Sequence, residues 1–194
     1  PLVSVVGQLN MTDVDLLDNT IDNKDPRDAL VWVLGGARLE RVEFSSNRSA
    51  ATFYHEGDGD DISIIRESTF SGAQPRVILA GVRGSIINSL IVGESPRAMG
   101  VHAWNSLVEI VNTTISSARS VAEIRAPSGA WAAATHVLAE ETGQVLLANT
   151  IVDGKVDPSR AWLPMVAATG AAKIEASKDS HISDGSGPQG FQPP

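Results

Sequence analysis

The sequence contains no cysteine, which excludes disulfide bonds, thiolate zinc sites and thiol nucleophiles. Aromatic residues make up only 5% of the 194 residues, whereas glycine and small polar residues are common. A helical bundle needs bulky apolar faces, so this composition favours a β-rich fold with a narrow, layered interior. Hydrophobic residues account for 42% of the chain, which is enough to fill the core of one domain.

Positive charge is also scarce, with 15 Lys and Arg against 23 Asp and Glu and a formal net charge of −8. Binding to nucleic acid relies on clustered Lys and Arg, so we expect no nucleic-acid partner. No apolar run reaches about 18 residues, so we expect no membrane span. The chain begins at Pro1 without an initiator methionine or a signal-peptide pattern, and we expect a processed mature chain or a fragment of a longer one.

Seven segments of the chain align with one another without gaps. The apolar column used to align them reads Ile21, Phe44, Phe70, Ile91, Ile115, Ile151 and Ile182. A second apolar column lies five residues earlier, is broken only at Ser177, and reads Leu16, Leu39, Ile65, Ile86, Ile110 and Leu146. Most successive segments are roughly two dozen residues apart, which is a typical length for one coil of a solenoid.

The spacing of five residues between the two apolar columns predicts a bend, because inward residues of a straight strand are an even number apart. Three residues before the apolar column that was used for the alignment, nearly all residues are polar or charged types that usually face solvent. This outward column reads Asp18, Arg41, Glu67, Asn88, Asn112, Ala148 and Asp179. The next column is small and polar except at Val42, and reads Asn19, Ser68, Ser89, Thr113, Asn149 and Ser180. We therefore expect a bend at the outward column, followed by a ladder of hydrogen-bonded polar side chains on successive coils.

These columns predict an all-β fold, a parallel β-helix solenoid of about seven coils over residues 1–183, followed by a Gly/Pro-rich tail or linker at 184–194. A β-sandwich is the main alternative, because it also contains many short strands and turns. A sandwich does not predict aligned columns across seven segments. A leucine-rich repeat has a similar period, but its fixed leucine spacing is missing.

The segments VDLLDNTIDN, VEIVNTTISSA and VLLANTIVDG resemble the coils of the right-handed parallel β-helix superfamily, the pectate-lyase-like solenoids. The short stretches FSSN and NTIVDG are most similar to repeat regions of bacterial surface proteins. The resemblance implies a right-handed solenoid and an extracellular or cell-surface location. It implies a non-enzymatic structural or adhesive module of a surface or phage-type assembly, or alternatively a carbohydrate-active enzyme or carbohydrate-binding module.

The densest acidic stretch lies between two predicted strands and offers four carboxylates, Glu56, Asp58, Asp60 and Asp61. Carboxylate oxygens are the ligands that Ca²⁺ prefers, so this stretch is a candidate calcium site. Its spacing does not match the twelve-residue calcium loop, and Gly57 and Gly59 are equally typical of a solvated turn. A calcium site and a plain turn both stay open.

Catalysis would require a base or paired carboxylates. The resemblance to pectate-lyase-like solenoids implies a lyase mechanism in which carboxylates bind Ca²⁺ and an Arg or Lys acts as the base. The candidate bases are the arginines near predicted strand ends, Arg76, Arg83 and Arg125. Hydrolysis needs two carboxylates roughly 5 to 10 Å apart. The candidate pairs are Asp58 with Asp60 or Asp61, and Glu40 with Glu67. Short turns leave little material for a cleft, so the sequence favours the non-enzymatic module.

Two tryptophans, Trp32 and Trp104, lie in predicted strands and are candidates for the core. Trp131 lies in an insertion at residues 126–137 and, with His136, is the candidate contact for carbohydrate or a protein partner. The four histidines show no metal-binding spacing. The expected partners are other protein subunits, copies of the same chain, or polysaccharide.

Overall fold

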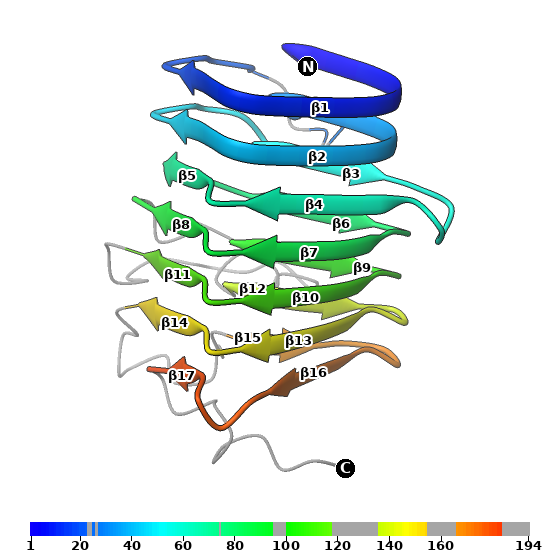
Figure 1. Cartoon of the computed structure of the whole chain (residues 1–194), viewed down its shortest axis with the longest axis vertical. Helices are drawn as coiled ribbons and strands as arrows, with labels where there is room; N and C mark the ends of the chain where they lie inside the picture. Colours follow the sequence, from blue (N-terminus) through cyan, green and yellow to red (C-terminus); the bar gives the residue numbers. More distant parts are fainter. Residues whose placement is uncertain are drawn as a thin grey trace.

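The computed structural model describes residues 1–22, 25, 27–73, 75–94, 100–117, 136–154 and 166–183. These residues form 17 strands that belong to one sheet, and every pairing between named strands is parallel. The sheet wraps about 319° round its own axis and closes almost completely (Figure 1). The predicted all-β solenoid is confirmed.

The first two coils each consist of one long bent strand, β1 (Val3–Leu17) and β2 (Val31–Ser45). Later coils divide into three strands, one on each face. The back face holds β3 (Phe53–Glu56), β6 (Val77–Ala80), β9 (Val101–Trp104), β12 (Val137–Glu140) and β15 (Val166–Ala168). The front face holds β4 (Ile62–Arg66), β7 (Arg83–Ile87), β10 (Leu107–Val111), β13 (Gln144–Ala148) and β16 (Lys173–Ala176). The left face holds β5 (Thr69–Gly72), β8 (Leu90–Gly93), β11 (Thr114–Ser117), β14 (Ile151–Gly154) and β17 (His181–Ile182).

The solenoid is right-handed and has seven coils. In Figure 1 the front strands run from right to left, the chain returns behind them, and each turn lies below the previous one. The front face stacks in the order β1, β2, β4, β7, β10, β13 and β16, which gives one strand for each predicted coil. The 184–194 tail lies outside the described residues.

Two inward apolar rows form much of the core. The left-face row reads Leu16, Phe44, Phe70, Ile91, Ile115, Val152 and Ile182. The front-face row reads Met11, Leu39, Ile65, Ile86, Ile110, Leu147 and Ala176. Phe44 and Phe70 stack directly, with ring centroids 4.7 Å apart.

The predicted columns are wrong in three coils. In the first coil the inward residue is Leu16 and not Ile21, so the alignment there is shifted by five residues. In the sixth coil Val152 is buried while Ile151 is 46% exposed, a shift of one residue. In the last coil the break predicted at Ser177 is absent, because Ala176 occupies the front-face row.

The bend between the front and left faces lies at the predicted outward column in four coils, and at Asp13 and Asn149 in the first and sixth coils, where Asp18 and Ala148 were predicted. One residue in each of six coils adopts a left-handed backbone there: Asp13, Arg41, Glu67, Asn88, Asn112 and Asn149. Such a residue bends the strand sharply, and Asn and Asp tolerate this conformation better than other non-glycine residues. A single residue therefore closes this corner.

The predicted polar ladder follows this bend directly. Ser68 Oγ accepts a hydrogen bond from the backbone N–H of Val42, one coil earlier, at 3.2 Å. Ser89 and Thr113 repeat the arrangement for the coils before them, at 3.3 and 3.4 Å. Thr150 occupies the same column in the sixth coil, where Asn149 was predicted. The hydroxyls of Ser68, Ser89, Thr113 and Ser180 thus each satisfy a backbone N–H of the coil before them.

The corner between the back and front faces is also short, except in the third coil, where residues 57–61 form a longer turn. One left-handed residue lies four positions after the start of each back-face segment in six coils: Gly7, Gly35, Gly81, Asn105, Glu141 and Gly170. At Gly35 a Cβ atom would lie 2.3 Å from the backbone oxygen of Gly7 on the neighbouring coil. Only glycine fits there, because both the backbone angle and the close approach exclude a side chain.

Candidate functional site

The outer surface of the back face differs from an ordinary solvated sheet surface. Its outward side chains include Tyr54, Ile78 and Leu138, which are at most 4% exposed. Tyr54 and Ile78 form a second apolar cluster outside the solenoid core, and Trp32 packs against it. Polar groups that lie among these side chains are therefore largely withdrawn from water, which strengthens their mutual interactions.

Three titratable side chains meet on this surface. Arg76 lies just before β6, His102 in β9 and Glu140 at the end of β12, so they come from three successive coils. Arg76 Nη2 lies 3.0 Å from Nδ1 of His102, and Nε2 of His102 lies 2.7 Å from Oε2 of Glu140. A guanidinium can only donate, so Nδ1 accepts and Nε2–H donates to the carboxylate. The three residues form a relay with a neutral imidazole at its centre.

The surroundings keep this imidazole neutral. Burial lowers the pKa of His102, and the charge of Arg76 lowers it further, against the opposing effect of Glu140. Burial also lowers the pKa of Arg76. Both ring nitrogens of His102 are already engaged, so the imidazole has no lone pair left for a substrate proton. The relay therefore links three coils, and its charged groups, Arg76 and Glu140, are both bound to His102.

Sequence reasoning identified Arg76 but missed its two partners. The relay residues are 26 and 38 positions apart, and no local motif connects such positions. Only the coil register brings them together, because residues in one column become neighbours across the sheet. A column of outward residues on the back-face segments, had it been aligned, would have placed His102 beside this surface.

Trp104 is the most exposed aromatic side chain of this region, and its prediction as a core residue is wrong. It is 44% exposed at the end of β9, on the outer side of the back face. The register places it between Ala80 and Glu140 on the neighbouring coils. Trp32 is half-buried against the outer apolar cluster and also lies outside the solenoid interior. An exposed indole beside a carboxylate can stack against a sugar ring or an apolar partner.

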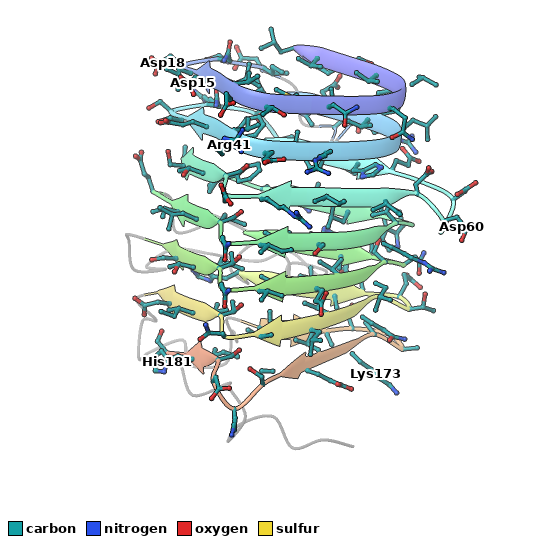
Figure 2. All side chains as sticks on the ribbon, in the orientation of Figure 1. Asp15, Asp18, Arg41, Asp60, Lys173 and His181 are labelled. Carbon is teal, nitrogen blue, oxygen red and sulfur yellow. The ribbon has the colours of Figure 1, made fainter. Side chains whose placement is uncertain are left out.

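The acidic stretch forms the turn between β3 and β4. Both carboxylate oxygens of Glu56 bind Arg27, at 2.9 and 3.1 Å. Asp58 and Asp61 accept backbone N–H groups of the turn itself. The Asp60 side chain is 96% exposed, lies 3.8 Å from Arg83 and points away from the solenoid (Figure 2). Within the described ranges no group of three or more His, Asp or Glu side chains is placed to hold a metal ion. Calcium binding at this turn stays a prediction.

The predicted pairing of Glu40 with Glu67 is wrong in register. Glu40 lies opposite Arg66 on the next coil, and Glu67 falls one column further on. Glu40 instead bridges Arg38 and Arg41, at 2.9 and 2.7 Å. These arginines lower the pKa of its carboxyl group. Glu40 is therefore an ionised surface residue in a chain of ion pairs.

The remaining candidate contacts are only partly described. His136 lies just before β12 and is 4% exposed, so it is buried beside the back face. Trp131 and Arg125 lie outside the described residues. The contact role predicted for Trp131 and His136 stays a prediction.

Comparisons with protein-family models, curated proteins and solved structures give no match. The class of this protein, a parallel β-helix solenoid, therefore rests on its own strand register and on the columns of its sequence. In the part of the chain that is described, no helix is long and apolar enough to cross a membrane.

Proposed function

We propose that this chain is a non-enzymatic structural or adhesive β-helix module of an extracellular surface or phage-type assembly. The observation that carries the proposal is the closure of two of the three corners, in six of the seven coils at each, by single left-handed residues, such as Asn112 between the front and left faces and Asn105 between the back and front faces. Corners of this length leave the neighbouring faces flat. Flat faces suit lateral packing against other subunits better than they suit a cleft around a substrate.

The chemistry of the described polar groups supports the same proposal. The relay of Arg76, His102 and Glu140 uses its imidazole nitrogens internally. Three of the four turn carboxylates, Glu56, Asp58 and Asp61, bind backbone groups or Arg27. The resemblance of VEIVNTTISSA to pectate-lyase-like solenoids, and of NTIVDG to bacterial surface repeats, favours an extracellular module of that superfamily.

A polysaccharide panel tests the proposal. The full chain would be incubated with neutral and uronate-containing polysaccharides, with and without CaCl₂, and the products followed by reducing-end assay and by absorbance of unsaturated uronates. We expect no cleavage of any substrate. Cleavage that survives repurification and disappears on substitution of a named residue would overturn the proposal and favour the enzymatic alternative.

Carbohydrate binding without cleavage is the second candidate function, and exposed Trp104 favours it. The indole lies beside Glu140, whose carboxylate can accept hydrogen bonds from sugar hydroxyls. Binding would change the tryptophan fluorescence on titration with oligosaccharides. We expect Trp104→Ala to abolish that change and Leu34→Ala, another exposed apolar residue at the corresponding position of β2, to preserve it. Equal responses of both variants would exclude Trp104 as the contact.

A further inference from the structure

The front face carries an aliphatic patch on its outer side. Strands β4, β7, β10 and β13 lie flat and side by side there (Figure 1). Ile62, Leu107 and Leu146 are 55%, 54% and 38% exposed. Half-buried Ile64, Ile87 and Val111 lie among them. Arg83 and Glu109 lie between these aliphatic side chains, so the surface is mixed. Exposed apolar side chains with polar neighbours on a flat sheet are characteristic of a protein contact.

The patch is crossed by one outward column with a distinctive order. This central column begins with Asn10 on the first coil and then reads, from the second to the seventh coil, Arg38, Ile64, Ser85, Glu109, Leu146 and Glu175. Over these six coils the first residue, Arg38, is basic and the last, Glu175, is acidic. The two aliphatic residues lie one coil inside each end.

This order is self-complementary only when two copies run in opposite directions. A twofold axis along the strands, between β7 and β10, places Arg38 opposite Glu175 of a second copy and Ile64 opposite its Leu146. In the two adjacent columns the same axis brings Ile87 of one copy to Val111 of the other and Arg83 of one copy to Leu107 of the other, where the aliphatic stem of the arginine can pack against the leucine. In a parallel arrangement the column would place each charge opposite an identical one, which is repulsive.

We propose that the front face is the interface of an antiparallel homodimer, with the occupant a second copy of this chain. This inference rests on the proposed structural or adhesive function and gives it a partner. Six strands about 4.8 Å apart and five residues long present a face of about 30 Å by 17 Å. Two such faces bury on the order of 1,000 Å², which is near the lower limit for a specific interface. An interface of this size is typical of a weak, reversible dimer.

The size of the particle and a pair of charge substitutions test the arrangement. Sedimentation velocity of the full chain over the micromolar range is expected to show a monomer–dimer equilibrium. Ile64→Asp places a carboxylate beside Arg38 in its own sheet, and Leu146→Lys places an ammonium beside Glu109 and Glu175, so both variants should fold. Each alone puts a charge against an aliphatic side chain of the other copy and is expected to weaken the dimer at least about a hundredfold.

The double variant Ile64→Asp with Leu146→Lys is the decisive sample. In the antiparallel dimer the two new charges pair across the interface, so dimerisation should return to within about tenfold of the original. Leu90→Asp, at an exposed aliphatic position of the left face, is the matched control and should leave the dimer intact. Circular dichroism would establish that each variant retains its β structure.

Three outcomes would overturn this inference: a monomer at every concentration, a dimer insensitive to Ile64→Asp, or single variants that the double variant does not rescue. The polysaccharide panel, run on the same samples, separates this failure from that of the proposed function. A monomer that cleaves nothing rejects the dimer alone. Cleavage rejects the proposed function whatever the size of the particle.

Discussion

Asn149 lies one coil after Asn112 and donates from its Nδ2 to Asn112 Oδ1 at 2.8 Å. Asn112 repeats the contact with Asn88 at 3.2 Å, so three amides form an exposed ladder along the solenoid. All three residues have a left-handed backbone. Asparagine thus has two roles at this corner, because it tolerates the backbone angle and links neighbouring coils.

Replacing Asn112 separates these two roles. Asn112→Ala should lower the free energy of unfolding by about 1–2 kcal/mol, because alanine is strained in the left-handed region. Asn112→Gly keeps the backbone angle and loses only exposed hydrogen bonds, so a loss of about 0.5 kcal/mol is expected. Urea unfolding would measure both. A glycine variant that loses as much stability as the alanine variant would show that the ladder matters more than the angle.

The buried hydroxyl of Thr113 gives a second prediction. It accepts from Ser89 N–H and donates to the Val111 carbonyl. Thr113→Val keeps the shape but leaves the Ser89 N–H without its acceptor, and should cost about 1–3 kcal/mol of stability. Thr114→Val, at the half-buried outward position next to it, should change stability by at most about 0.5 kcal/mol. Similar losses in both variants would contradict a specific role for the hydroxyl.

The coil pattern was predictable because each coil repeats the same physical requirements. The outward column marked the bend at Arg41, Glu67, Asn88 and Asn112, and the structure gives each of these residues a left-handed backbone. The sixth coil was misaligned because Ile151 and Val152 are both apolar. An alignment shifted by one residue therefore placed an apolar residue in the hydrophobic column equally well. The left-handed backbone of Asn149 fixes the register of this coil, and a backbone conformation cannot be seen in the sequence.

The first coil was misaligned for a related reason. LLDNTIDN resembles LLANTIVD of the sixth coil, yet the two stretches occupy different places in their coils. Asp18 has a left-handed backbone at the end of the left face, two residues after inward Leu16, as Ser46 does on the next coil. The hydrogen bonds of His102 and the exposure of Trp104 were even harder to predict from the sequence, because they depend on contacts between coils.

Calcium is expected to have no stabilising effect on this protein. Glu56 is bound to Arg27, and Asp58 and Asp61 accept backbone N–H groups, so binding would have to break existing contacts. Thermal unfolding in EDTA, in CaCl₂ and in MgCl₂ should give the same Tm. A ligand that binds the folded state raises Tm. A rise specific to Ca²⁺ and abolished by Asp58→Asn would establish the predicted calcium site.

Stability should fall on acidification because of the buried histidines. Burial lowers the pKa of both His55 and His102 in the folded protein. The unfolded chain therefore binds these protons more readily, and acid favours unfolding. This stabilisation is complete above the ordinary histidine pKa of about 6.5 and is lost as the pH falls below it, at no more than about 1.4 kcal/mol per pH unit for each histidine.

His102→Gln tests the share that belongs to the relay. A glutamine amide can accept from Arg76 and donate to Glu140, but it does not titrate, so the pH dependence should be shallower by up to about 1.4 kcal/mol per pH unit. Urea unfolding from about pH 7.5 to about 5.5 would measure the slope. His181→Gln, at an exposed position of β17, is the matched control and should keep the original slope. An unchanged slope in His102→Gln would mean that His102 is protonated to the same extent in the folded and unfolded states.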